Sequence, residues 1–182
     1  RIRKVSACGT ISTVAGTGTA GFGGDGGPAT SAALHWPVGV ATDRAGALYI
    51  ADSANHRIRK VWANGTIATV AGTNVPSSGD GGPATAAALS WPYGVAVDRI
   101  GALFIADEGN QRIRKVWSNG AITTVAGTGA ASFGGDGGSA TAATLNTPRG
   151  VAVDDAGVLY IADTYNNRIR AAVSASSSIS FT

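Results

Sequence analysis

The sequence predicts an all-β fold built from three near-identical repeats. The motif RIRKV at Arg1 returns at Arg57 and Arg112, and as RIRAA at Arg168, so the period is 55 to 56 residues. Glycine occurs 27 times in the 182 residues, and 44% of the chain is hydrophobic while only 14% is charged. This composition is typical of a globular chain with a buried core, many turns and short strands. Hairpin signals that recur in every copy argue against an α-helical solenoid.

Each repeat predicts four short antiparallel strands. In the second copy we expect them at residues 94–98, 102–106, 112–117 and 121–126. The sequence DRIG at 98–101 predicts a tight turn, and SNG at 118–120 predicts a hairpin. In the third copy, residues 140–145 of the long glycine-rich connection predict one helical turn, which is too short for a parallel crossover. Identical repeats of four antiparallel strands are the pattern of β-propeller blades.

The same residues resemble NHL repeats, whose hallmark is a PxGVAVD strand followed by an IAD turn and an NxRI strand. In the second copy these motifs stand at residues 92–98, 105–107 and 110–113. The connection containing GDGGPAT is similar to that of bacterial secreted NHL proteins and of the teneurin NHL region. The resemblance extends from Arg1 to about Arg170 and implies a propeller, commonly of six blades.

The repeats divide the chain 1–182 into a partial blade and three blades. The partial blade is expected at 1–16 and the blades at 17–72, 73–127 and 128–182, the last with a divergent C-terminal tail. Three blades are too few for a six-bladed ring, and an open segment exposes strand edges and apolar faces. We therefore expect self-association on a two-fold axis, or further repeats of the same polypeptide. A head-to-tail array is a third possibility, in which a structural protein polymerises through blade edges.

An aspartate stands five residues before an arginine in each repeat. The pairs are Asp52 with Arg57, Asp107 with Arg112, and Asp163 with Arg168. A carboxylate and a guanidinium across a tight turn can form a bidentate pair that ties adjacent strands. Because the pair recurs once per blade, we predict a structural role for it.

Two further sets of repeated aspartates are expected to shape turns. Asp43, Asp98 and Asp154 close the first strand of each repeat and are predicted to cap the following turn through side-chain to backbone hydrogen bonds. Asp25, Asp80 and Asp136 lie between glycines. One carboxylate per loop falls short of a calcium site, so turn formation is the preferred interpretation.

The sequence offers no catalytic residues, no metal ligands and no cofactor motif. His35 and His56 are not repeated, and no serine stands in a GxSxG elbow. The stretch GGDGG at 23–27 lacks the Lys-Ser/Thr of a P-loop. The single Cys8 excludes an intrachain disulfide and a cysteine zinc site. We therefore predict a protein that is not an enzyme, with a propeller hydrolase or lyase as the alternative.

Positions that differ between otherwise matching repeats are the candidates for ligand binding at the propeller mouth. They are Val38, Tyr93 and Arg149, just before the innermost strands, and Ser53, Glu108 and Thr164 on connecting turns. Neutral variation on an exposed loop is the competing interpretation. Trp36 and Trp91 precede the strand prolines and are predicted to pack between blades. The predicted function is a non-enzymatic interaction scaffold that binds a protein or another ligand.

The net charge of +3 is small and comes from the recurring RIRKV motif. Strand alternation splits those charges between two faces, and aromatic stacking partners are few, so nucleic acid is an unlikely partner. No run of 18 apolar residues is present, which argues against membrane insertion. The Gly/Ala/Thr-rich, lysine-poor composition favours an exported bacterial protein, extracellular or periplasmic.

Overall fold

The computed structural model describes residues 1–73, 79–175 and 178–181, and its regular structure is antiparallel sheet joined by short 3₁₀ turns. A two-stranded sheet contains β1 (Ile2–Val5) and β2 (Ile11–Ala15). Three four-stranded sheets follow. They contain β3 (Pro37–Thr42), β4 (Leu48–Asp52), β5 (Arg57–Val61) and β6 (Ile67–Ala71); β7 (Pro92–Val97), β8 (Leu103–Asp107), β9 (Arg112–Val116) and β10 (Ile122–Ala126); and β11 (Pro148–Val153), β12 (Leu159–Asp163), β13 (Arg168–Ala175) and β14 (Ser178–Phe181). The all-β prediction is confirmed, with four strands in each complete sheet.

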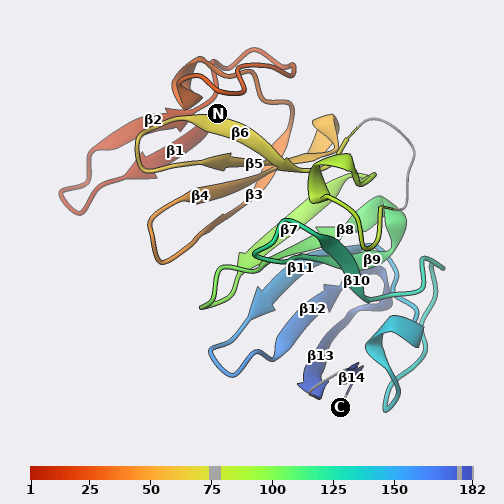
Figure 1. The fold of residues 1–182 in the computed structure, drawn as a ribbon. Coiled ribbons are helices and arrows are strands. Elements are labelled where there is room, and N and C mark those ends of the chain that lie inside the picture. Colours follow the sequence, from red (N-terminus) through yellow and green to blue (C-terminus); the bar gives the residue numbers. More distant parts are fainter. Residues whose placement is uncertain (74–78, 176–177, 182) are drawn as a thin grey trace.

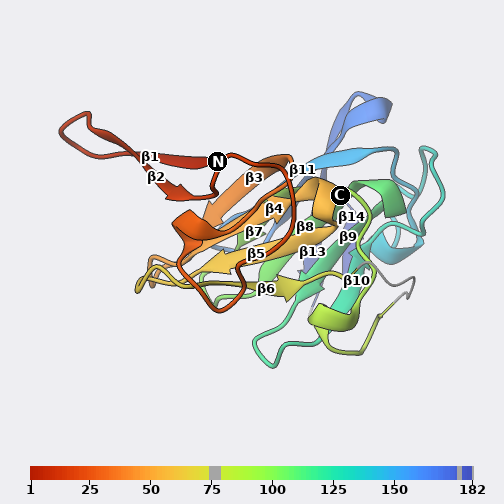
Figure 2. The same ribbon diagram turned by 90° about the horizontal axis from the view of Figure 1, so that it is seen from above.

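The sheets succeed one another as blades of a propeller segment (Figures 1 and 2). Within each complete sheet the strands pair in chain order. The helical turn expected at 140–145 is present as the 3₁₀ turn η5 (Ala140–Ala142), with η1 (Ala29–Ser31) and η3 (Ala84–Ala86) at the matching places. The turns η2 (Ser53–Asn55), η4 (Glu108–Asn110) and η6 (Thr164–Asn166) join the second and third strands. No helix in the described part of the chain has the length and apolarity that a membrane crossing requires.

The first strands of the complete sheets pack side by side, with β7 between β3 and β11. The glycine of the PxG motif makes this approach possible. A Cβ added at Gly39 would lie 2.2 Å from the carbonyl oxygen of Tyr93, and one at Gly94 would lie 2.5 Å from that of Arg149. Both distances are shorter than any real Cβ contact, so a side chain at either position would force the inner strands apart.

The hydrophobic core lies between neighbouring blades. Ile58 is fully buried against Ala84 and Leu89, which belong to the next repeat, and Ile113 is fully buried in the same way against Ala140 and Leu145. Each repeat therefore completes the core of the repeat before it, as in other repeat proteins.

The outermost sheets lack one of these neighbours. Ile169, which corresponds to the fully buried Ile58 and Ile113, is 72% exposed on the last sheet. On the two-stranded sheet Ile11 is 55% exposed, whereas its counterpart Ile67 is fully buried. Core-type residues at both ends of the segment are thus open to solvent.

The glycine-rich connection covers the outer edge of the sheets β3–β6 and β7–β10. The N–H of Gly26 donates to the carbonyl of Ile67 at 2.8 Å, and the N–H of Ile67 donates to Gly27 at 3.0 Å. Gly81 and Gly82 make the same two bonds with Ile122 at the start of β10. The connection therefore satisfies backbone groups of the edge strands β6 and β10, which limits pairing with another chain there.

The predicted pairing of each aspartate with the arginine five residues later is wrong. Asp52 does not use Arg57 but forms its ion pair with Arg59, at 3.3 Å between Oδ2 and Nη1. Arg57 faces Asp52 across the strand pair, yet its Nη1 donates to the carbonyl oxygen of Asn55 at 2.8 Å. Arg59 lies on the same face two residues later, where a long side chain still reaches the carboxylate.

The other two repeats show the same shift. Asp107 forms its ion pair with Arg114, at 3.3 Å, and not with Arg112. Asp163 forms its ion pair with Arg170, at 3.4 Å, and not with Arg168. Arg112 donates to the carbonyl of Thr128, and Arg168 to that of Asn166. Both members of every observed pair are buried, so the pairs are structural, although the arginines differ from those predicted.

The aspartates between glycines do more than form turns. Asp25 accepts a hydrogen bond from Arg59 Nη2 at 2.5 Å, and the same arginine also donates to the carbonyls of Gly23 and Ala33. Asp80 and Asp136 pair in the same way with Arg114 and Arg170. The buried guanidinium thus joins the sheet to the glycine-rich connection.

The turn-capping role predicted for the strand-end aspartates is confirmed. Asp43 Oδ1 accepts the N–H of Ala47 at 2.9 Å, and Asp98 Oδ1 accepts that of Ala102 at 2.8 Å. Asp154 makes the equivalent bond to Val158 at 2.8 Å. These bonds hold the turn between the first and second strand of each blade.

Replacing Arg59 with leucine should strongly destabilise the protein. The change leaves the fully buried Asp52 without its countercharge, and the loss of one partner of a buried pair costs about 3–5 kcal/mol. The midpoint of urea unfolding, followed by circular dichroism, measures the effect. The control is Arg44→Leu, since Arg44 is 73% exposed and its ion pair is worth at most about 1 kcal/mol. Equal midpoints for the two variants would contradict the role assigned to Arg59.

Replacing Gly94 with alanine should weaken the packing of the inner strands. The new Cβ would clash with the Arg149 carbonyl, and overpacking of this kind costs about 1–3 kcal/mol or more. Gly23→Ala is the matched control, because a Cβ there would meet no atom within 4 Å and should change stability by less than about 0.5 kcal/mol. Thermal unfolding of the two variants compares them, and a Gly94 variant as stable as the control would refute the close approach.

Candidate functional site

A cleft of about 360 Å³ opens where the inner strands begin. We call it the mouth cleft. Its walls come from the residues around the strand prolines and from the 3₁₀ turns η2 and η4. The lining residues are Trp36, Val38, Ser53, Trp91, Tyr93, Glu108, Gly109, Gln111, Thr147 and Arg149.

The structure brings five of the six predicted ligand positions together in this cleft. Val38, Tyr93 and Arg149 come from the inner strands of three successive blades, while Ser53 and Glu108 come from the adjoining turns. The sixth, Thr164, does not line the cleft, and its Oγ1 donates to the carbonyl of Ala162 at 3.3 Å.

An ion pair between two blades provides the charge of the mouth cleft. Arg149 donates from Nε and from Nη2 to Glu108 Oε1, at 3.1 Å each. Its guanidinium carbon lies 5.1 Å from the ring centre of Tyr93 and 5.7 Å from that of Tyr165. The hydrogen bond to Glu108 raises the pKa of Arg149, although desolvation opposes the shift. The guanidinium is thereby fixed between two aromatic rings, with a side chain that remains 40% exposed.

Two tryptophans form an aromatic surface beside this ion pair. The rings of Trp36 and Trp91 meet edge to face, 5.8 Å apart between centroids. They contact one another across neighbouring repeats, in keeping with the prediction that they pack between blades. They are nevertheless 66% and 40% exposed, which is high for such large apolar side chains. Sequence reasoning missed their place in the cleft.

The backbone of the cleft is held in an unusual conformation. Trp36, Trp91 and Thr147 have φ values of +54°, +48° and +54°, in the left-handed region that bulky residues rarely adopt. His56 Nδ1 accepts the N–H of Trp91 at 3.1 Å, and Gln111 Oε1 accepts that of Thr147 at 2.6 Å. Strained residues held by their surroundings are found disproportionately at functional sites.

A signal for these residues was present in the sequence. Trp36, Trp91 and Thr147 occupy one repeated slot that changes in the third copy, and His56, Gln111 and Asn167 occupy another that differs in all three. The criterion that selected Val38, Tyr93 and Arg149 would also have selected both slots.

Metal-binding side chains do not gather in the described ranges 1–73, 79–175 and 178–181. No three His, Cys, Asp or Glu side chains there lie close enough to hold a metal ion. His35 is exposed, and Ser53 Oγ donates to the carbonyl of Pro92 at 2.6 Å. The arrangement of the mouth cleft suits recognition through aromatic and guanidinium contacts.

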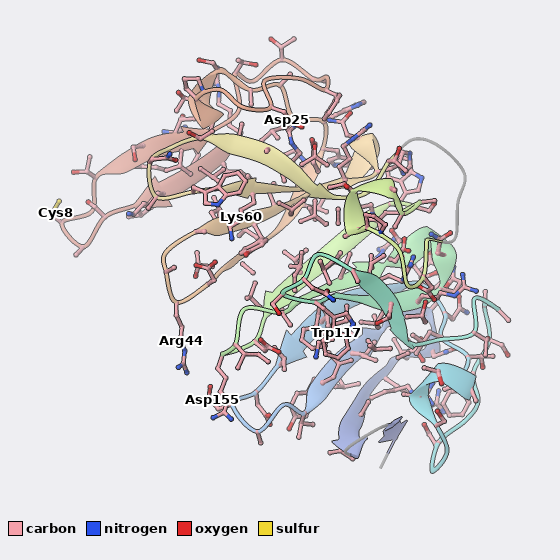
Figure 3. The ribbon with its side chains drawn as sticks, in the orientation of Figure 1. Cys8, Asp25, Arg44, Lys60, Trp117 and Asp155 are labelled. Atoms are coloured by element: carbon pink, nitrogen blue, oxygen red, sulfur yellow. The ribbon has the colours of Figure 1, made fainter. Side chains whose placement is uncertain are left out.

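A weak ion pair lies beyond the opposite ends of the inner strands. Arg44 and Asp155 are 3.6 Å apart but 73% and 90% exposed, so their ion pair contributes little (Figure 3).

Cys8 lies exposed in the β1–β2 turn, where hydrogen bonds with Ser6 and Thr10 lower the pKa of its thiol to about 7.

Comparison with protein families matches most of the chain. Residues 18–78 and 75–133 match the teneurin NHL domain, and residues 145–171 match the NHL repeat. Human teneurin-1 is 29% identical over 227 residues, which cover 81% of this chain and 8% of that protein. The chloroplastic protein SUPPRESSOR OF QUENCHING 1 of Arabidopsis thaliana is 36% identical over 96 residues, covering 52% of this chain and 9% of its own length. The chain thus spans less than a tenth of these relatives, and the resemblance to NHL repeats is confirmed.

Solved structures share the fold. A structural genomics protein of unknown function from Bacteroides thetaiotaomicron has a TM-score of 0.71 at 22% identity, covering 91% of this chain and 40% of that one. Virginiamycin B lyase from Staphylococcus aureus has a TM-score of 0.57 at 17% identity, covering 99% of this chain and 47% of that one. At these identities the similarity concerns the arrangement of the blades.

Proposed function

Because this chain belongs to the family of teneurin NHL domains, we propose that it is a non-enzymatic interaction module that binds an extended segment of a partner protein in the mouth cleft. The observation that carries the proposal is the convergence of five non-repeated positions from three blades on one cleft. Repeated residues in this chain support the architecture, whereas a ligand must be recognised by residues that differ from blade to blade. The composition supports a site of action outside the cytoplasm, extracellular or periplasmic.

The chemistry of the mouth cleft favours a protein ligand. Trp, Tyr and Arg are the residues most enriched at the energetic centres of protein interfaces, and Trp91, Tyr93 and Arg149 lie together in the cleft. Glu108 already holds Arg149 in place, so little conformational entropy remains to be lost when a partner binds. The tryptophan surface would receive an apolar or proline-containing segment, and Arg149 would face a carbonyl or carboxylate group.

Binding is favoured over catalysis because the polar groups of the cleft are committed to one another. Ser53 donates to the Pro92 carbonyl, Gln111 accepts the Thr147 N–H, and Glu108 pairs with Arg149. Side chains held by such hydrogen bonds can position a ligand, whereas a general acid or base must exchange a proton with its substrate. The lyase and hydrolase alternatives would require a different set of residues from those that line the mouth cleft.

Selection from a random peptide library displayed on phage tests the proposal with a defined probe. Selected peptides should lose about tenfold or more in affinity for the double variant Trp91→Ala, Arg149→Ala, since truncation of interface centres costs about 1–2 kcal/mol or more. The control is Arg44→Ala, which changes an exposed arginine at the other end of the inner strands. Failure to select any peptide, or equal binding by the double variant, would refute a protein site in the mouth cleft.

We further propose that a second copy of the chain covers the open face of the last blade. The supporting observation is Ile169, which is 72% exposed although Ile58 and Ile113 at the same position are fully buried by the following repeat. A second copy can supply the same type of surface, and closed two-fold assemblies are common. The last sheet already contains four strands, β11 to β14, so a partner would cover this blade and not complete it.

Replacing Ile169 with aspartate should therefore abolish self-association. Light scattering after size exclusion, at two protein concentrations, should give the mass of two chains for the unchanged protein and of one chain for this variant. Ile100→Asp is the control, because Ile100 is 73% exposed in a turn distant from that face and should leave the mass unchanged. A monomer at both concentrations would refute the dimer, and large heterogeneous species would favour polymerisation through blade edges instead.

A further inference from the structure

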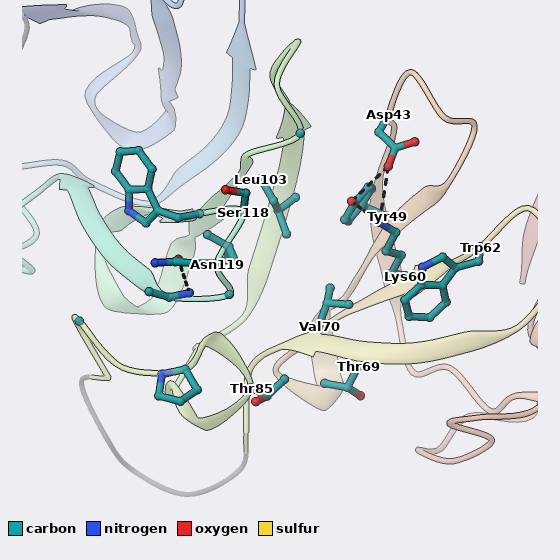
Figure 4. Close-up of a pocket in the computed structure, with 17 residues that line it drawn as sticks. Asp43, Tyr49, Lys60, Trp62, Thr69, Val70, Thr85, Leu103, Ser118 and Asn119 are labelled. Atoms are coloured by element: carbon teal, nitrogen blue, oxygen red, sulfur yellow. Dashed lines mark hydrogen bonds and ion pairs between the residues drawn. The ribbon is translucent and has the colours of Figure 1, made fainter.

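A second cleft of the described residues is separate from the mouth cleft. It has a volume of about 810 Å³ and lies between the sheet β3–β6 and the sheet β7–β10. We call it the side groove. Figure 4 shows Tyr49, Lys60 and Trp62 on one wall and Ser118 and Asn119 on the other. Its size is within the range of small-ligand sites.

One wall of the side groove is an exposed indole. Trp62 is 39% exposed, and it lines the groove together with Thr69 and Val70 of the edge strand β6. The negative face of an aromatic ring attracts polarised C–H groups and excludes water from them. An indole in this position therefore offers a flat platform on which a ring carrying C–H groups can stack.

Uncharged polar groups line the groove across from this platform. Thr85, Ser118 and Asn119 are exposed and line the groove from the second sheet and its connection. Asn119 Oδ1 accepts the N–H of Ala121 at 3.0 Å, which fixes the side chain and leaves its amide nitrogen for a ligand. Hydroxyl and amide groups can both donate hydrogen bonds to the hydroxyl groups of a ligand and accept hydrogen bonds from them.

The charged groups of the side groove neutralise one another. Lys60 Nζ lies 3.5 Å from Asp43 Oδ2 and donates to the Tyr49 hydroxyl at 2.7 Å. Burial opposes the ionisation of Asp43, but the Ala47 N–H and the Lys60 ammonium prevail and lower the pKa of its carboxyl group. Asp43 is therefore ionised opposite Lys60 at neutral pH, and the groove has no unbalanced charge to select a phosphate or a carboxylate.

A peptide strand is a poor fit for the side groove. The first residue of β6, Ile67, already exchanges both backbone hydrogen bonds with Gly26 and Gly27. A strand added to β6 would collide with this connection, so recognition must proceed through side chains.

We propose that the side groove binds a neutral oligosaccharide. The apolar face of one sugar ring stacks on Trp62, and the hydroxyl groups at its rim bond with Asn119, Ser118 and the Asp43–Lys60 pair. A ligand of this class matches a groove that combines the exposed indoles of Trp62 and Trp117 with uncharged polar groups and balanced charges. The site is independent of the mouth cleft and of the protein ligand proposed for it.

The chain contains a natural comparison for this site. The corresponding groove beside the sheet β1–β2 is lined by Val14, Pro28, Thr30 and Asn64, which match Val70, Pro83, Thr85 and Asn119. Ser6 stands there in place of Trp62, and the volume is only about 280 Å³. The tryptophan at position 62 thus distinguishes the side groove from the corresponding groove beside the sheet β1–β2.

Isothermal titration with neutral hexasaccharides tests the proposal. The panel contains β-1,3-, β-1,4- and α-1,4-linked glucose and β-1,4-linked N-acetylglucosamine, together with a charged uronic acid hexamer. At least one neutral member should bind with a Kd of about 1 mM or tighter, and Trp62→Ala should weaken it by about tenfold or more. The control Trp36→Ala removes an exposed tryptophan of the mouth cleft and should leave sugar binding unchanged.

Four outcomes would overturn the proposal. The first is the absence of binding by every neutral hexasaccharide at about 10 mM, and the second is equal binding by the Trp62 variant. The third is tighter binding of the uronic acid, which would make the groove an anion site. The fourth is a requirement for Trp62 in the binding of the peptides selected on the chain, which would make the groove a protein site. Circular dichroism of the Trp62 variant verifies that it is folded, and because Trp62 is exposed the spectrum should match that of the unchanged protein.

Discussion

The buried guanidinium in each blade is the interaction on which the rest of the structure depends. Arg59 joins Asp52 at the end of β4 to Asp25 in the glycine-rich connection, and it also donates to two carbonyl groups of that connection. A charge with no exposed surface is tolerated only when its partners are all in place. The sheet and the connection therefore depend on one another, since without the connection Arg59 would lose the Asp25 carboxylate and the two carbonyl acceptors.

The position of the connection has two consequences for the neighbouring parts of the molecule. Its glycines pair with the start of the edge strand β6, and the same type of connection places Ala84 and Leu89 against Ile58 of the preceding blade. One segment thus covers a strand edge and completes a core between blades. Because every core needs the following repeat, exposure of Ile169 at the last blade is a direct result of the architecture and not a local defect.

The sequence was sufficient for the fold because its signals are local and repeated. Hairpin turns, alternating strands and the glycine of the PxG motif act within a few residues, and three agreeing copies remove most of the ambiguity. The partner of Asp52 could not be predicted in this way. Arg57 and Arg59 lie on the same strand face, and the choice between them depends on where the connection places Asp25 and on the Asn55 carbonyl that takes Arg57. The place of Trp36 was missed for a related reason, since the left-handed backbone at that position turns its ring to solvent.

Differences between repeats are a good guide to function, but only where the chemistry itself differs. The mouth cleft follows this rule, since Val38, Tyr93 and Arg149 share one slot and no two are alike. In the side groove the lysine and tryptophan at 60 and 62 are repeated at 115 and 117, and on repetition alone they would count as architecture. Tyr49 is replaced by Phe104 in the second copy, so the hydroxyl group that receives Lys60 is absent there. Burial lowers the pKa of Lys115, although the charge of Asp98 opposes this shift. The Nζ atom of Lys115 lies 4.0 Å from the ring centre of Trp117, whereas that of Lys60 lies 5.6 Å from the ring centre of Trp62. Trp62 and Trp117 both line the side groove and are 39% and 43% exposed, so the changed residue alters what each lysine contacts and not the exposure of the rings. A repeated motif can therefore have a different chemical environment in each copy when the residue next to it varies.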